Sequence, residues 1–161
     1  MSDTNSFTVL VCGGRNFIKE WLVFDALEEQ WEAHGQQLTV VEGGARGADS
    51  AAALWAQTWA EQGRNVTHRQ FRAGWHEHGW KAGPIRNQRM LDEARPDLVL
   101  AFPGGAGTAD MVHRAEKAGI PVIFPCAEPE ERKDSVSSNR EMPDAGTPAA
   151  AAPPERSENP R

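Results

Sequence analysis

The sequence predicts an α/β fold, in which an open parallel sheet of about five strands is covered by helices on both faces. First, short runs of β-branched and other apolar residues alternate along the chain with segments of helical periodicity. Second, these runs are too apolar to face water on either side, which is typical of parallel strands buried between helices. Third, several of the runs stop at glycine-rich turns, which suit a sharp passage from a strand into a helix.

The first half of the chain contains three predicted strands separated by two helices. In order, these are the strand Phe7–Cys12, the helix Phe17–His34, the strand Leu38–Glu42, the helix Asp49–Gln62 and the strand Asn65–Phe71. The first helix is expected to begin through Asn16 and to end at Gly35. Apolar residues at helical spacing give each helix one face for packing. The residues expected to pack are Trp21, Phe24, Leu27, Trp31, Ala51, Leu54, Trp55 and Trp59.

The second half continues the alternation after a polar loop. In order, we expect the loop Arg72–Gly83, a helix with Pro84 in its first turn that runs to Ala94, the strand Asp97–Phe102, a helix capped by Thr108 and closed by Gly119, and the strand Pro121–Phe124. Within the loop, Trp75 and Trp80 suggest a lid whose ring stacks on a base. A zinc site at His76 and His78 is a poor reading because no third ligand follows at a suitable spacing.

The chain divides into a folded domain, residues 1–126, and a tail, residues 127–161. Only 39% of the 161 residues are hydrophobic, and the tail accounts for much of this low share. Its sizeable apolar side chains are Val136 and Met142, too few to offset the entropy of ordering it. We therefore predict that the tail is disordered.

Composition also limits the classes of function. The net charge of −6 makes broad binding of nucleic acid unfavourable. The two cysteines, Cys12 and Cys126, have no metal-binding spacing and read as buried thiols of a reducing compartment. We expect no metal and no cofactor. The polar, acidic N-terminus lacks a signal peptide, and no segment reaches membrane-spanning length, so a cytoplasmic protein is expected.

Three glycine-rich segments carry the candidate site, because all three leave the carboxyl ends of predicted parallel strands. They are Gly13-Gly14-Arg15, Gly43-Gly44-Ala45-Arg46-Gly47-Ala48-Asp49 and Pro103-Gly104-Gly105-Ala106-Gly107-Thr108. Their glycines would permit positive φ and would let backbone amides approach an anion, aided by the positive end of the following helix. Asp49 reads either as a helix cap or as a ligand contact, and Thr108 either as a cap or as a hydroxyl donor.

Arginines strengthen the prediction of a phosphate site. Arg15, Arg46 and Arg86 fall at or near this edge of the sheet in a chain that is acidic as a whole. A guanidinium group matches phosphate oxygens in a bidentate arrangement. Arg89, one turn after Arg86, would assist or would pair with an acid on its own helix.

Four motifs together resemble one family. Val11–Phe17, Glu42–Asp49, Gly83–Met90 and Phe102–Thr108 are similar to those of the YspA/YpsA-related branch of the SLOG superfamily, which also contains the LOG phosphoribohydrolases and the DprA proteins. The resemblance implies a Rossmann-like sheet with strand order 3-2-1-4-5. By resemblance alone, a homodimer is expected.

The resemblance also bears on catalysis. LOG enzymes use a Pro-Gly-Gly-x-Gly-Thr-x-x-Glu motif and an arginine, which Pro103–Thr108 and Arg86 resemble, but Met111 stands at the glutamate position. Asp110 is one residue away, so it points about 100° from that direction on a helix. If the chain is an enzyme, Arg86 and Asp110 are the candidate catalytic residues, with Glu42 or Asp49 as other sources of the carboxylate.

The leading interpretation is a binding or sensor protein for a nucleotide or nucleotide derivative. Its phosphate would lie on Gly104, Gly105, Gly107 and Thr108, with Arg86 neutralising charge and Gly13, Gly14 and Arg15 closing the other side. One alternative is a hydrolase that cleaves the N-glycosidic bond of nucleoside monophosphates. The other is single-stranded DNA binding in the manner of DprA, which the acidic balance disfavours.

Overall fold

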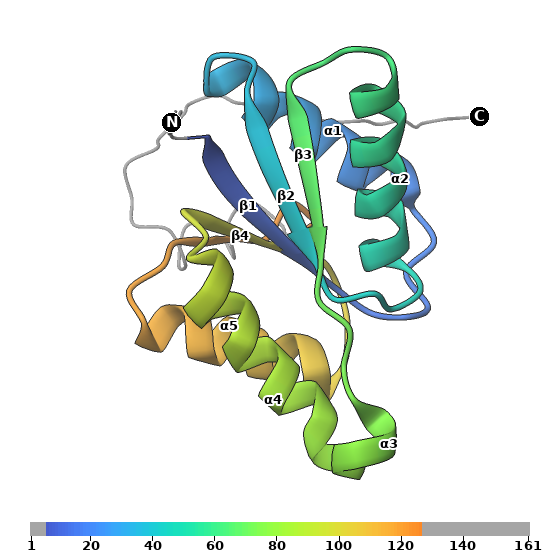
Figure 1. The fold of residues 1–161 in the computed structure, drawn as a ribbon, viewed down its shortest axis with the longest axis vertical. Coiled ribbons are helices and arrows are strands. Elements are labelled where there is room, and N and C mark those ends of the chain that lie inside the picture. Colours follow the sequence, from blue (N-terminus) through green and yellow to red (C-terminus); the bar gives the residue numbers. More distant parts are fainter. Residues whose placement is uncertain (1–5, 127–161) are drawn as a thin grey trace, which may run out of the picture.

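A computed structural model describes residues 6–126 and contains one sheet of five parallel strands in the order β3-β2-β1-β4-β5 (Figure 1). The strands are β1 (Phe7–Cys12), β2 (Leu38–Glu42), β3 (Val66–Gln70), β4 (Leu98–Ala101) and β5 (Val122–Ile123). Both the predicted Rossmann-like class and the predicted strand order are confirmed. The predicted tail, 127–161, lies outside the described residues.

The helices lie on both faces of the sheet. They are α1 (Glu20–Ala33), α2 (Ala48–Glu61), the short α3 (Trp75–His78), the 3₁₀ turn η1 (Gly79–Lys81), α4 (Ala82–Arg89), its π-helical continuation η2 (Met90–Ala94), and α5 (Ala106–Lys117). In Figure 1, α1 and α2 lie on one side of the strands, and α4 and α5 lie on the other. No helix in this part of the chain combines the length and apolar character needed to cross a bilayer.

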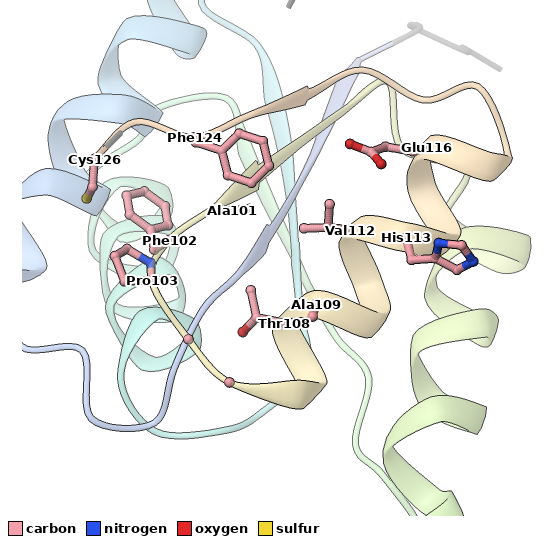
Figure 2. Close-up of a pocket in the computed structure, with 12 residues that line it drawn as sticks. Ala101, Phe102, Pro103, Thr108, Ala109, Val112, His113, Glu116, Phe124 and Cys126 are labelled. Carbon is pink, nitrogen blue, oxygen red and sulfur yellow. The ribbon is translucent and has the colours of Figure 1, made fainter. Parts of the chain in front are cut away.

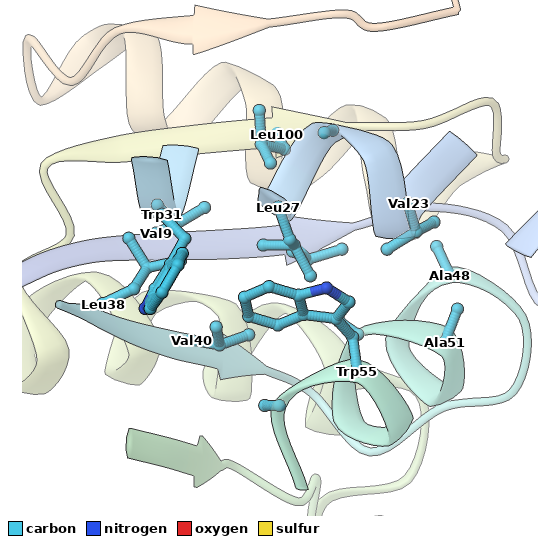
Figure 3. Close-up of a cluster of buried hydrophobic side chains, with 14 of the residues drawn as sticks. Val9, Val23, Leu27, Trp31, Leu38, Val40, Ala48, Ala51, Trp55 and Leu100 are labelled. Atoms are coloured by element: carbon cyan, nitrogen blue, oxygen red, sulfur yellow. The ribbon is translucent and has the colours of Figure 1, made fainter. Parts of the chain in front are cut away.

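Successive side chains of a strand point to opposite faces of the sheet, so the hydrophobic core has two parts. Val9 and Val11 of β1 belong to the cluster beneath α1 and α2, whereas Leu10 and Cys12 of the same strand pack with η2 and α5. This is the two-residue period of a strand buried on both faces. Figure 3 shows the first cluster, where the Trp55 ring lies among side chains of α1 and the central strands.

Two expected core residues are instead on the surface. Trp21 is 58% exposed and Leu54 is 50% exposed. In α1 the buried stripe runs through Val23, Leu27 and Trp31, at intervals of four residues, so Trp21 falls outside it. In α2, small alanines fill the positions facing the sheet, and Leu54 lies beside them.

Several helix ends also differ from the predictions. Helix α1 begins at Glu20 rather than through Asn16, because residues 14–17 form a turn in which the Phe17 amide donates to the Gly14 carbonyl (3.2 Å). Neither Asp49 nor Thr108 is a cap, since Gly47 and Gly105 precede α2 and α5. The predicted loop 72–83 contains α3 and η1.

Candidate functional site

The three glycine-rich loops meet at the carboxyl edge of the sheet, as predicted for parallel strands. We call them the β1 loop (residues 13–19), the β2 loop (43–47) and the β4 loop (102–105). The Gly14 amide donates to the Pro103 carbonyl (2.8 Å), which joins the β1 and β4 loops. The Gly14 carbonyl accepts from the Ala48 amide (3.4 Å), which joins the β1 loop to the start of α2. The β1 loop therefore lies between the other two.

Close packing explains why most of these positions hold glycine. The expectation of positive φ is wrong for the glycines of the β1 and β4 loops and holds only for Gly44 and Gly47 of the β2 loop. A Cβ on Gly13 would stand 2.6 Å from the Ala48 Cβ, and one on Gly104 would stand 2.6 Å from the Gly14 nitrogen. Gly104 thus lets one backbone approach another, and Gly13 leaves room for the Ala48 and Phe102 side chains.

Gly105 and Gly107 have no such explanation. A Cβ on either would meet no atom within 4 Å, and neither has a positive φ. Gly107 lies inside the first turn of α5, where glycine is less favourable than alanine by roughly 0.5–1 kcal/mol. Packing among the described residues thus does not require glycine at these two positions.

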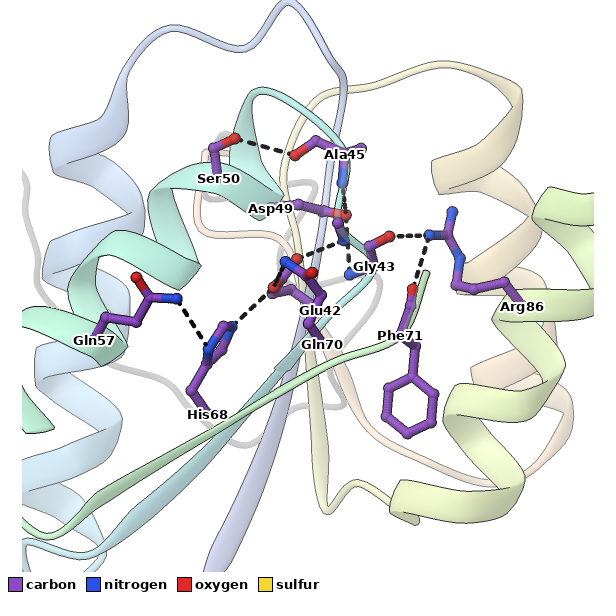
Figure 4. A network of polar contacts seen from close by, with 11 residues as sticks. Glu42, Gly43, Ala45, Asp49, Ser50, Gln57, His68, Gln70, Phe71 and Arg86 are labelled. Carbon is purple, nitrogen blue, oxygen red and sulfur yellow. Dashed lines mark hydrogen bonds and ion pairs between the residues drawn. The ribbon is translucent and has the colours of Figure 1, made fainter. Parts of the chain in front are cut away.

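The β2 loop is closed by its own hydrogen bonds (Figure 4). The Asp49 carboxylate accepts from the amides of Gly43 (3.0 Å) and Ala45 (3.2 Å). Arg86, on α4, donates through Nη1 to the carbonyls of Gly43 and Phe71. Burial is the largest influence on both groups: it raises the pKa of Asp49 to about 6 and lowers that of Arg86. Arg86 therefore acts first as a clip between α4 and the β2 loop.

A second network lies at the end of β2. The fully buried Glu42 carboxylate accepts from Gln70 Nε2 (2.9 Å) and from the Gly44 amide (2.5 Å), and it pairs with His68 Nε2 (2.8 Å). Sequence reasoning missed His68 and Gln70. The signal was a glutamate ending an apolar run opposite a strand of polar residues, and the parallel register pairs Glu42 with Gln70.

Two cavities flank the β4 loop. One, of about 790 Å³, lies between the β1 and β4 loops and is lined by Gly14, Arg15, Lys19, Gly104 and Gly105 among others. It occupies the crevice beside β1 and β4, where the direction of strand order reverses.

The other cavity, of about 560 Å³, lies on the opposite side of the β4 loop. Thr108, His113 and Glu116 of α5 line it together with Phe124 (Figure 2). The β4 loop residues Gly104 and Gly105 line both cavities. Gly43, Asp49 and Arg86 line neither cavity, so the predicted site divides into an open part and a part closed by hydrogen bonds.

Exposed cations lie on the loops at this edge of the sheet, and two of them, Arg15 and Lys19, line the larger cavity. Arg15, Lys19, Arg46 and Arg72 are all exposed, and none forms an ion pair with another residue between 6 and 126. The Arg15 guanidinium lies 5.8 Å from the centre of the Trp75 ring. The described residues that line the larger cavity include Arg15 and Lys19 and no acid, so this cavity suits an anion. The predicted pairing of Arg89 with an acid is found, since Arg89 contacts Glu93 (3.2 Å).

The candidate catalytic carboxylate lies away from the cavities. Asp110 accepts from Asn87 Nδ2 (2.9 Å) and Arg114 Nε (2.8 Å), which joins α5 to α4. Burial opposes ionisation, but these hydrogen bonds outweigh it and lower the pKa of Asp110. Met111, at the position of the LOG glutamate, is buried in the core. Sequence reasoning assigned no role to Asn87, a buried amide that also donates to the Gly107 carbonyl (3.2 Å).

Comparisons with known proteins agree with the motifs. The sequence model of the YspA, cpYpsA-related SLOG family matches residues 7–78. The Gene 61 protein of Mycobacterium phage D29 is 45% identical over 117 residues, which are 71% of this chain and 93% of the phage protein. Among solved structures, the Moco Carrier Protein from Chlamydomonas reinhardtii has a TM-score of 0.49 at 21% identity, covering 80% of this chain and 82% of that one. On the family match and the phage relative, the chain belongs to the YspA, cpYpsA-related SLOG family.

Proposed function

We propose that the protein binds a nucleotide or a nucleotide-derived small molecule, whose phosphate lies at the start of α5 beside the β1 loop. The observation that carries this proposal is the pair Gly105 and Gly107. The fold has open space at both positions, and glycine weakens the helix at Gly107. A ligand that contacts the backbone at this turn would supply the missing reason for glycine at Gly107, whereas Gly105 also serves as the N-cap of α5.

The amides at this turn support an anion as the contacting group. Backbone hydrogen bonding in α5 begins at Ala109, whose amide donates to the Gly105 carbonyl (3.0 Å). The amides of Ala106, Gly107 and Thr108 have no backbone acceptor among the described residues. Such amides, together with the helix dipole, favour a phosphate group.

The arginines have different parts in this proposal. Arg15 lines the larger cavity, and Arg46 stands exposed on the neighbouring loop. Either can approach a phosphate without breaking an ion pair to a described residue. Arg86 is bonded to two carbonyls through Nη1, so its contribution is to hold the β2 loop.

Binding without cleavage is the better-supported form of the proposal. Cleavage of an N-glycosidic bond builds positive charge on the ribose, which a carboxylate beside the sugar would stabilise. The carboxylates of Glu42 and Asp49 accept hydrogen bonds from amides of the β2 loop, and that of Asp110 accepts one from Asn87 of α4. Glu116, at the rim of the second cavity, is exposed to solvent.

The test is equilibrium binding of nucleoside monophosphates, measured by calorimetry and by thermal shift. Gly105→Leu should lower the melting temperature only slightly, because its Cβ position is open although leucine is a poorer N-cap than glycine, yet it should obstruct the ligand. Arg15→Gln should also weaken binding, whereas Lys117→Gln, an equal change of charge at the far end of α5, should not. Unaltered affinity in Gly105→Leu would show that the phosphate lies elsewhere.

A further inference from the structure

Trp75 is an exposed tryptophan that faces Arg15 of the β1 loop. It is 49% exposed, and the edge of its ring packs against Gly83 at the start of α4, where a Cβ would lie 3.5 Å from Cη2. The Arg15 guanidinium, which also lines the larger cavity, faces the ring. Trp80, in the same segment, is 80% exposed and faces Lys81 instead.

The cation–ring pairs of the described residues fall into two groups, one closely stacked and the other, which includes Arg15 and Trp75, at 5.1–5.8 Å. Arg64 lies 3.7 Å from the centre of the Trp59 ring and 4.1 Å from that of Trp31, as a closely stacked guanidinium does. Arg15 lies 5.8 Å from the centre of the Trp75 ring, so this pair is not closely stacked. Stacked bases are separated by about 3.4 Å, so a planar base between the two groups needs about 6.8 Å. The exposed Arg15 side chain would therefore have to move outward to admit a base.

Building on the proposed function, we propose that the ligand carries an aromatic base, which inserts between the Arg15 guanidinium and the Trp75 indole. Trp75 is thereby a specificity-determining residue: it selects nucleotides over sugar phosphates that lack a base. Stacking on an aromatic ring tolerates any base, because every base has a π face. The guanidinium on the opposite side adds a planar, cationic surface.

The experiment compares two kinds of probe on the full chain. The first probes are the monophosphates of adenosine, guanosine, cytidine and uridine, and the second is ribose 5-phosphate, which lacks only the base. We expect tighter binding of at least one nucleotide than of ribose 5-phosphate. Trp75→Ala should weaken nucleotide binding by roughly 5- to 100-fold and leave ribose 5-phosphate unaffected. Trp75→Phe should retain most of the affinity.

Control variants separate stacking from charge and from folding. Trp80→Ala removes an exposed indole from the same segment and should bind like the wild type. Arg15→Lys keeps the positive charge but replaces the planar guanidinium with an ammonium group, so it should weaken the binding of nucleotides more than that of ribose 5-phosphate. Nucleotide binding should quench part of the tryptophan fluorescence, and Trp75→Phe should lose this quenching while Trp80→Phe keeps it.

The outcomes distinguish the two proposals. If ribose 5-phosphate binds as tightly as the nucleotides, or if Trp75→Ala affects both kinds of probe equally, the base does not lie on Trp75 and phosphate binding stands. If neither kind of probe binds, the proposed function fails and this inference fails with it.

Discussion

Replacing Gly104 by alanine should separate the β1 and β4 loops. The added Cβ would overlap the Thr108 hydroxyl, which can rotate away, and would stand 2.6 Å from the Gly14 nitrogen, which cannot. Overpacking of this kind costs about 1–3 kcal/mol. Loss of the 2.8 Å hydrogen bond from the Gly14 amide to Pro103 adds about 1 kcal/mol. We expect the free energy of unfolding to fall by about 2–4 kcal/mol.

Gly107→Ala is the matched control, three residues further along the chain. Its Cβ would meet no atom within 4 Å, and alanine is the better helix former, so stability should rise by about 0.5–1 kcal/mol. Urea unfolding followed by far-ultraviolet circular dichroism measures both variants. If Gly104→Ala unfolds within about 0.5 kcal/mol of the wild type, the loops are not locked together as argued.

Three further predictions concern the closed part of the site and the question of cleavage. Because burial raises the pKa of Asp49 from 3.8 to about 6, the folded protein binds this proton more tightly than the unfolded chain. Stability should therefore fall by roughly 3 kcal/mol as the pH rises through that window, and urea unfolding at several pH values should show no such fall in Asp49→Asn. Arg86→Ala should lower the free energy of unfolding by about 2–4 kcal/mol by the same assay, since two carbonyls lose a charged donor, and a value unchanged from wild type would contradict the clip. Because Met111 replaces the LOG glutamate, chromatography should detect no free base after incubation with nucleoside monophosphates; release of base would favour the hydrolase.

Much of the fold could be predicted from the sequence because its signals are local. The strand Leu38–Glu42 is found with the predicted bounds, since an apolar run stopped by glycines is informative by itself. Helix ends were harder. Asn16 is a favourable cap residue, but the turn closed by the Gly14 carbonyl delays α1 until Glu20.

The position of the site could be predicted from the sequence, but the contacts that its residues make could not. Parallel topology brings the glycine loops to one edge, whichever residues they contain. Whether a glycine serves a positive φ, a close approach or a ligand depends on neighbouring loops that are distant in sequence. In the same way, the sequence places Arg86 near this edge but does not show that the Gly43 carbonyl accepts its hydrogen bond.

The contact of backbone on backbone among the three loops has a consequence for how this family can diverge. A side chain gained at Gly13, Gly47 or Gly104 must displace a neighbouring loop, so drift at one of these positions demands compensation at another. Outward-facing positions such as Arg15 and Arg46 carry no such constraint. Relatives should therefore keep the shape of this edge, whereas the side chains that project from it are free to change.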